Sequence, residues 1–253
     1  MLKSLNSLRG QSLAAIDGEI GRIKDALFDD HQWGVRYLVV STGDWLSGRD
    51  VLISPNSIDA PAPGQVHLNV RLTREQVQNS PDVDFERPIP RQVEQDFYSY
   101  YGWTPYWVGF PLELFPSAVV SGGNDDGDDE RGNGNKETGG NETGGTPTPA
   151  AEDVLRREEM SHLRSAREVE GYHLNAIDGD IGHLVDYLID GDSWQIVSIV
   201  ADTKNWFSGK KVVLPVSDFE RIDWYNRLAR TRLTREEIKS APEFSSVEAA
   251  HEA

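Results

Sequence analysis

Cysteine is absent from this 253-residue sequence, and long apolar runs are absent as well. The lack of cysteine excludes disulfide bonds, thiolate metal ligands and cysteine nucleophiles. The lack of an uncharged apolar run of about 20 residues predicts no membrane-spanning helix. The first nine residues contain neither a continuous apolar stretch nor a small-residue cleavage site. We therefore expect no signal peptide and a cytoplasmic location.

Basic residues are scarce relative to acidic ones. The 25 Lys and Arg residues stand against 42 Asp and Glu residues, which gives a formal net charge of −17. Nucleic acids and anionic membranes are bound by clustered Lys and Arg. We therefore expect no nucleic-acid partner, and membrane association only through a partner complex or through an aromatic segment.

The sequence contains an internal repeat. Residues 16–21, IDGEIG, recur as residues 177–182, IDGDIG, which sets an offset of 161. The same register continues without a gap to residues 71–75, RLTRE, which recur as residues 232–236. A period of this length is typical of a duplicated domain rather than of a solenoid repeat.

The pattern within each copy predicts β structure. Asp-Gly pairs indicate type I′ hairpin turns, and Thr followed by acidic residues indicates the start of a short helix that ends before Ser-Pro or Ala-Pro. We expect strands over residues 20–28, 33–40 and 51–53, repeated over 181–189, 194–201 and 212–215, and helices over 72–77 and 233–238. The predicted fold class is mainly β, with two small barrels that each end in a short helix.

The regions outside the repeat have distinct compositions. Residues 121–150 are rich in Gly, Asn, Asp, Glu, Thr and Pro and contain no aliphatic residue larger than Ala, which predicts a disordered acidic linker. Residues 97–110 are dense in aromatic residues and broken by Gly and Pro, so we expect no long helix there. The predicted domains are 1–86 for the first barrel, 87–120 for an aromatic and proline-rich extension, 121–150 for the linker, 151–167 for a connecting helix and 168–253 for the second barrel.

The repeated strings resemble the PRC-barrel family. The resemblance rests on IDGEIG, on residues 33–40 (WGVRYLVV), on residues 45–53 (WLSGRDVLI) and on LTRE with a following Ser-Pro. This family is the β-barrel of the cytoplasmic domain of the photosynthetic reaction-centre H subunit and of the C-terminal part of a ribosome-maturation factor. Both relatives dock on a protein partner, so the resemblance implies a non-enzymatic adaptor whose linker allows relative motion. The alternative is a membrane-peripheral, H-subunit-like protein that assists electron or proton transfer in a complex.

Candidate catalytic and metal-binding residues have ordinary explanations. No histidine recurs at the offset of 161, so none belongs to a duplicated site, and no Walker loop, HExxH or GxSxG motif is present. Carboxylates recur, but Asp17 and Asp29 occupy turn positions and Glu75 a first helical turn, where acids are favoured. We expect no catalytic residue, cofactor or metal ion. The six histidines, predicted to lie at the surface or in structural roles, are His31, His67, His162, His173, His183 and His251.

The candidate partner-binding residues are large apolar side chains in polar loops. Such a side chain either folds back over the barrel or stays exposed as a contact for a protein partner, and Trp is a favoured anchor residue at protein interfaces. The aromatic segment likewise either packs within the protein or its oligomer, or forms an interfacial contact. The candidates are Trp45 and Leu46, their counterparts Trp206 and Phe207, and Trp103, Tyr106 and Trp107.

Overall fold

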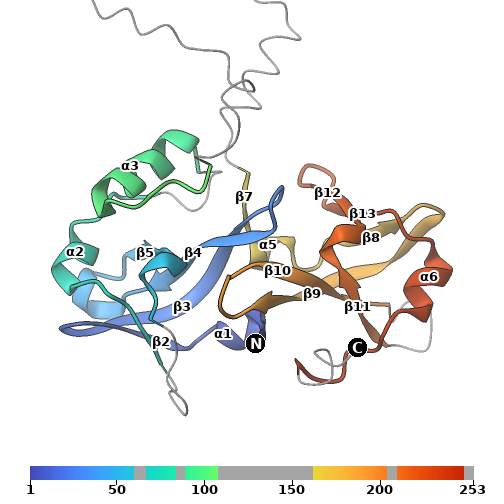
Figure 1. Cartoon of the computed structure of the whole chain (residues 1–253), viewed down its shortest axis with the longest axis horizontal. Helices are drawn as coiled ribbons and strands as arrows, with labels where there is room; N and C mark the ends of the chain where they lie inside the picture. Colours follow the sequence, from blue (N-terminus) through green and yellow to red (C-terminus); the bar gives the residue numbers. More distant parts are fainter. Residues whose placement is uncertain (60–66, 84–88, 108–161, 204–209, 248–253) are drawn as a thin grey trace, which may run out of the picture.

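The computed structural model describes residues 1–59, 67–83, 89–107, 162–203 and 210–247. The predicted linker and residues 108–120 of the extension lie outside these ranges, as do the candidates Trp206 and Phe207. Figure 1 shows two groups of strands side by side, the first copy in blue to green and the second in yellow to red. The fold is mainly β, as the sequence predicts.

The first copy, residues 2–80, begins with a short strand and helix and ends with a short helix. An additional helix, α3, follows it. In chain order the elements are β1 (Leu2–Ser4), α1 (Leu5–Leu8), β2 (Ser12–Ala15), β3 (Gly18–Asp29), β4 (Gly34–Ser41), η1 (Gly43–Leu46), β5 (Asp50–Ile53), η2 (Pro55–Ser57), β6 (Leu68–Asn69), α2 (Arg74–Gln78) and α3 (Arg91–Tyr101).

The second copy, residues 163–241, repeats this series at the offset of 161 residues, except that strand β12 corresponds to residues 58–62, of which only 58 and 59 are described. Strand β3 corresponds to β9, and helix α1 corresponds to α5, with the same length in each case. The elements are β7 (Leu163–Ser165), α5 (Ala166–Val169), β8 (His173–Ala176), β9 (Gly179–Asp190), β10 (Ile196–Asp202), β11 (Lys211–Pro215), η4 (Val216–Asp218), β12 (Phe219–Asp223), β13 (Leu228–Thr231) and α6 (Arg235–Ser240).

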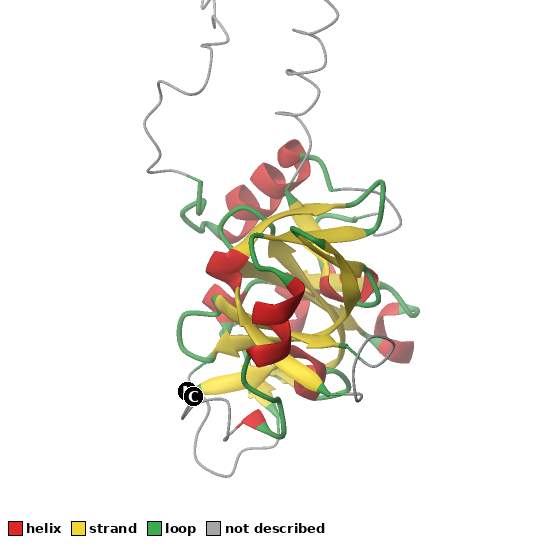
Figure 2. Cartoon of the chain, turned by 90° about the vertical axis from the view of Figure 1, so that its right-hand side faces the viewer, coloured by secondary structure: helices red, strands yellow, loops and turns green. Residues whose placement is uncertain are grey.

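The strands of each copy form an open sheet rather than a closed barrel. The order is β5-β4-β3-β2-β6 in the first copy and β11-β10-β9-β8-β13-β12 in the second. The hairpins are antiparallel, whereas β2 pairs with β6, and β8 with β13, in parallel. Figure 2 shows the strands gathered in the interior with the helices around them.

The local signals act as the sequence predicts, with one shift at the hairpin. The capping boxes of Thr73 with Gln76 and Thr234 with Glu237 begin α2 and α6. The Asp-Gly hairpins form, but the turn residues are Ile16 and Asp17, and Gly18 already opens β3 with a φ of 148°. A positive φ at this position favours glycine because other residues rarely adopt it.

The two copies exchange their first strands. Strand β1 pairs antiparallel with β9 of the second copy, and β7 pairs antiparallel with β3 of the first copy. Strands β3 and β9 are long enough, at 12 residues each, to hold a hairpin partner at one end and the exchanged strand at the other. The predicted connecting helix lies mostly outside the described residues; within them, residues 163–165 form strand β7 and residues 166–167 begin helix α5.

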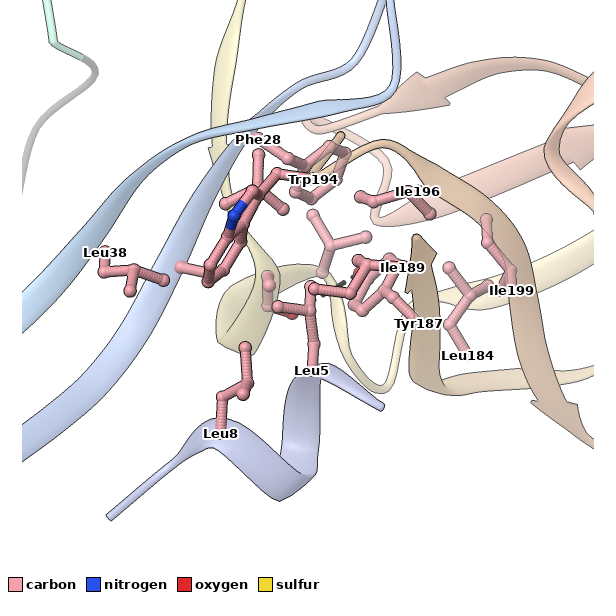
Figure 3. Packing of buried hydrophobic residues seen from close by; sticks show 14 of the residues in the cluster. Leu5, Leu8, Phe28, Leu38, Leu184, Tyr187, Ile189, Trp194, Ile196 and Ile199 are labelled. Atoms are coloured by element: carbon pink, nitrogen blue, oxygen red, sulfur yellow. Dashed lines mark hydrogen bonds between the residues drawn. The ribbon is translucent and has the colours of Figure 1, made fainter. Parts of the chain in front are cut away.

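One hydrophobic core runs through both copies. Leu5 and Leu8 of α1 point toward side chains of the second copy, among them Tyr187 and Ile189, and Phe28 of β3 lies beside Trp194 (Figure 3). The rings of Phe28 and Tyr187 are 5.4 Å apart between centroids. A shared core and exchanged strands tie the copies into one body, which differs from the expectation of two domains that move independently.

Candidate interaction site

The contact between the copies follows a pseudo-two-fold axis, along which equivalent residues meet. Gly34 bridges Gln195, and these positions are counterparts at the offset of 161. On either side of them, the Val35 N–H donates to the Trp194 carbonyl at 2.9 Å and the Ile196 N–H donates to the Trp33 carbonyl at 2.6 Å. Each copy thus presents the same surface to the other, as subunits do in an isologous dimer.

A serine–aspartate hydrogen bond recurs on each side of the axis. The Ser4 hydroxyl donates to Asp186 at 2.5 Å, and the equivalent Ser165 hydroxyl donates to Asp25 at 2.5 Å. Each aspartate also accepts a backbone N–H, from Asn6 at 3.1 Å and from Arg167 at 3.0 Å. Asp25 and Asp186 therefore hold the exchanged segments in place, which gives these recurring carboxylates a structural role.

Arg9 and Glu170 form a bidentate ion pair at the axis. They are counterparts, and the two nitrogen–oxygen distances are 2.8 and 2.6 Å. Burial lowers the pKa of Arg9, but the hydrogen bonds and charge of Glu170 outweigh it, so the pKa is raised overall. Burial, together with the nearby Asp186 and Asp25, raises the pKa of Glu170 despite the opposing effect of Arg9. The single guanidinium of Arg9 thus interacts electrostatically with several carboxylates at the centre of the contact.

A hollow of about 470 Å³ lies where the copies meet, lined by residues of both. Its charged lining is mixed, because Arg36, Arg71 and Lys3 are accompanied by Asp59 and Asp192. Arg71 and Asp59 already form an ion pair at 3.0 Å. A lining of mixed charge favours neither an anionic nor a cationic ligand.

The Trp45 loop folds back on the first copy. The indole Nε1–H of Trp45 donates to the Ile20 carbonyl, and the Arg74 guanidinium lies over the indole ring at 4.3 Å from its centroid. Trp45 and Leu46 are partly buried and pack against the shared core. The indole is thus anchored within the chain, and the role of these residues as partner contacts stays a prediction.

The aromatic segment packs on the outer face of the first sheet and begins within a helix, α3, that the sequence pattern does not predict. Helix α3 ends at Gly102, whose φ of 66° is left-handed, and the following aromatics return over α3. Tyr37, Phe97 and Tyr98 are buried between the sheet and this helix, with Trp103 and Trp107 against them. Burial raises the pKa of the Tyr98 hydroxyl to about 12.

A polar network fixes the end of this segment. The Arg91 guanidinium donates to the Tyr106 hydroxyl at 2.8 Å, and that hydroxyl donates to the buried Glu94 at 2.9 Å. The Arg36 guanidinium lies 3.9 Å from the centroid of the Tyr106 ring. These contacts orient Trp103, Tyr106 and Trp107 within the chain, and their role in partner binding stays a prediction.

The other recurring carboxylates serve turns and caps. Asp17 accepts the Arg74 N–H at 2.8 Å, and its counterpart Asp178 accepts the Arg235 N–H at the same distance. Asp29 accepts the N–H groups of His31 and Gln32, which closes the turn after β3. These contacts agree with the turn-and-cap interpretation of the sequence.

Two exposed isoleucines occupy the tips of the β2–β3 and β8–β9 hairpins. Ile16 is 73% exposed and its counterpart Ile177 is 69% exposed. The neighbouring Asp17 and Asp178 hold each tip against the first residue of a helix, α2 in the first copy and α6 in the second. Each copy thus presents one large apolar side chain on a fixed turn.

Two copies of a small β module that pair about a pseudo-two-fold axis define this chain as a tandem-repeat β protein. The family model described as the PRC-barrel domain matches residues 2–71, and this part of the chain belongs to that family. A search of curated proteins finds no match. None of the helices in the described part of the chain has the length and hydrophobicity needed to cross a bilayer.

The residues at the axis were not singled out from the sequence, although the repeat contained a signal for them. The register of 161 extends back to residue 2, where Leu2 and Ser4 correspond to Leu163 and Ser165. This match shows that the first strand belongs to the repeated unit. It does not reveal that the strands are exchanged, because exchange depends on the geometry of the chain between the copies.

Proposed function

We propose that the chain is a non-enzymatic protein-interaction module that acts as an adaptor. The PRC-barrel match supports a module of the protein-interaction type, and the paired copies provide two equivalent faces on one body. Because the copies share a core, the spacing between the faces is set by the fold rather than by a linker. The adaptor would therefore bind two sites at a fixed separation, or one symmetric partner.

The observation that carries this proposal is the pair of exposed isoleucines. An isolated exposed apolar residue is ordinary on a protein surface. Here, however, Ile16 and Ile177 are counterparts at the offset of 161, both are exposed, and each stands on a hairpin tip fixed by an aspartate. A rigid apolar side chain is a favourable contact for a partner because little conformational entropy is lost on binding.

The test is cross-linking and affinity purification from the native cell. We expect the double variant Ile16→Ser/Ile177→Ser to lose partners that the wild type captures, while the matched control Tyr225→Ser retains them, because Tyr225 is 85% exposed but lies outside both hairpin tips. Circular dichroism would show that each variant is folded. Identical partner sets for the wild type and the double variant would refute the role of the hairpin tips.

The alternative of an H-subunit-like, membrane-peripheral protein rests on the fold resemblance and the aromatic segment. The described part of that segment packs on the first sheet, so no observation on its side chains favours this alternative over the adaptor. Membrane fractionation separates the two proposals, since only the alternative requires co-purification with membranes. The cytoplasmic location is part of the adaptor proposal and is tested by the same fractionation.

A further inference from the structure

Two histidines and an aspartate meet where strand β3 ends beside the start of β7. Asp30 and His31 follow β3 of the first copy, and His162 precedes β7 of the second copy. Their potential ligand atoms all lie within 4.8 Å of one another. We propose that this cluster binds one divalent transition-metal ion, with Zn²⁺ as the best match to its chemistry.

The backbone brings the three residues together. The β3–β7 ladder ends with Asp29 opposite Leu163, and the next pair is joined by a hydrogen bond from the Asp30 N–H to the His162 carbonyl at 3.1 Å. Directly opposed residues of an antiparallel pair have their side chains within contact distance. Asp30 and His162 are therefore held close by the register of the exchanged strand.

The turn after β3 then places His31 above His162. Asp29 accepts the His31 N–H at 2.8 Å and thereby closes this turn. The two imidazole rings stack with their centroids 3.7 Å apart and their planes 28° apart. Two imidazoles and a carboxylate thus converge from opposite copies.

An oxygen of Asp30 lacks a donor. The Asp30 side chain is only 7% exposed, and its Oδ2 accepts from Arg164 Nε at 2.8 Å. Its Oδ1 is buried without a hydrogen-bond partner, and His162 Nδ1 lies 3.6 Å away, which is too long for a hydrogen bond. Buried carboxylate oxygens are normally satisfied because desolvation is costly. A cation between Oδ1 and the imidazoles would satisfy this oxygen.

The donor set selects the class of ion. Neutral imidazoles and a carboxylate suit Zn²⁺ and its neighbours in the first transition row, whereas Ca²⁺ and Mg²⁺ prefer oxygen ligands only. Three protein ligands leave at least one coordination position for water. Arg164 binds the second oxygen of Asp30 and would act as a positioning residue that orients the carboxylate.

Only one of the two pseudo-symmetric junctions carries this donor set. The counterparts of Asp30, His31 and His162 are Gly191, Asp192 and Met1. At that junction the Met1 amino group lies 3.6 Å from Asp190 and 3.7 Å from Asp192, an ion pair in place of the imidazoles. The expected stoichiometry is therefore one ion per chain. Because the ligands come from both copies, the ion would also fasten the exchanged strand β7 to the first sheet.

The experiment is titration of the tag-free, full-length chain with Co²⁺ and Zn²⁺, followed by visible absorption for Co²⁺ and by calorimetry for both ions. The ligand variants are His31→Ala, His162→Ala and Asp30→Asn. The controls are His67→Ala, an exposed histidine outside the cluster, and the double variant His173→Ala/His183→Ala, which removes a second pair of histidines that face each other across β8 and β9. Because His31 is exposed, His31→Ala is expected to fold, and circular dichroism would check this.

The proposal predicts saturation at one ion per chain for the wild type and for both controls. Each ligand variant should weaken binding by more than the roughly 10- to 100-fold that loss of an outer-shell partner causes. Zn²⁺ should raise the thermal midpoint of the wild type and of His67→Ala but not that of His31→Ala. The absence of saturable binding, equal affinity in His31→Ala, or loss of binding in the β8–β9 control would each overturn it. The result is independent of whether the hairpin tips bind a partner.

Discussion

Removal of Arg9 should destabilise the whole chain, because the ion pair with Glu170 lies at the centre of the contact between the copies. Exposed ion pairs contribute about 0.2–1 kcal/mol, whereas breaking a fully buried pair costs about 3–5 kcal/mol. The Arg9 and Glu170 side chains are 25% and 19% exposed, so the Arg9 site lies between these limits. The variant also leaves Glu170 near Asp25 and Asp186 without their cation. We expect Arg9→Ala to lower the free energy of unfolding by about 2–3 kcal/mol.

A matched control is available in the first copy. Arg71 and Asp59 form an ion pair at 3.0 Å, but their side chains are 58% and 47% exposed. Arg71→Ala should therefore cost no more than about 1 kcal/mol in the same urea titration. An Arg9→Ala variant that is no less stable than Arg71→Ala would refute the argument.

The pseudo-symmetry also predicts a rescue. Arg9→Glu alone places two carboxylates opposite each other and should be more destabilising than Arg9→Ala. The double variant Arg9→Glu/Glu170→Arg should recover most of the loss, because the flanking Asp25 and Asp186 are themselves counterparts and present the same surroundings to either position. A double variant as unstable as Arg9→Glu would show that the two sides of the axis are not equivalent.

The effect of pH provides a further check on Arg9. Burial raises the pKa of Glu170 in the folded protein, so the folded state binds this proton more tightly than the unfolded chain. Arg9 opposes this rise, so its removal raises the pKa of Glu170 further. As the pH falls through this pKa, the folded variant gains more stability from protonation of Glu170 than the wild type does. The cost of Arg9→Ala should therefore be smaller near pH 5 than at pH 7, as measured by urea unfolding at each pH.

Three further perturbations test other parts of the structure. Trp45→Phe removes the donor to the Ile20 carbonyl and should cost about 1–2 kcal/mol in urea unfolding, while a change within error would contradict the anchored indole. Gly21→Ala should cost about 2 kcal/mol or more, because the new Cβ would lie 2.0 Å from the Ser41 carbonyl oxygen, whereas Gly43→Ala, with no atom within 4 Å, should cost less. Hydrogen bonds from Ser193 and Asp192 lower the pKa of Asp190 to about 2. The stability that this carboxylate contributes is therefore present above its ordinary pKa of about 3.9 and is lost as the pH falls toward 2. In Asp190→Asn, the free energy of unfolding should fall less steeply with pH over this range.

The repeated secondary structure could be predicted from the sequence because its signals are local. Residues 20–28 and 181–189 alternate or run apolar and lie within β3 and β9, and Thr73 and Thr234 cap α2 and α6. The exchange of β1 and β7 could not be predicted, since a three-residue strand carries little pattern of its own. Helix α3 was not predicted either, because the Gly and Pro residues of the aromatic segment 97–110 indicate no long helix, whereas half of α3 lies before that segment, in residues 91–96.

The candidate sites show the same contrast: those marked by local sequence signals could be predicted, and those formed by contact between distant segments could not. Trp45 and its loop could be identified because the repeat marks them, and the alternatives of packing or partner contact were both open. The histidine–aspartate cluster could not be found, because His31 and His162 are not counterparts and meet only through the exchanged strand. Spacing along the chain carries no information on such a pair.

The charges at the axis explain why the two copies pair with each other. In a dimer built from two first copies, position 9 would meet itself across the two-fold axis and bring two arginines together; in a dimer of second copies, two glutamates would meet at position 170. Only the pairing of unlike copies gives the bidentate contact observed between Arg9 and Glu170. Like charges at a contact disfavour the wrong partner as effectively as opposite charges favour the right one. Divergence at a single pair of equivalent positions thus favours the pairing of unlike copies over the pairing of like ones. Within one chain, this pairing places the hairpin tips and the proposed metal ligands on one body.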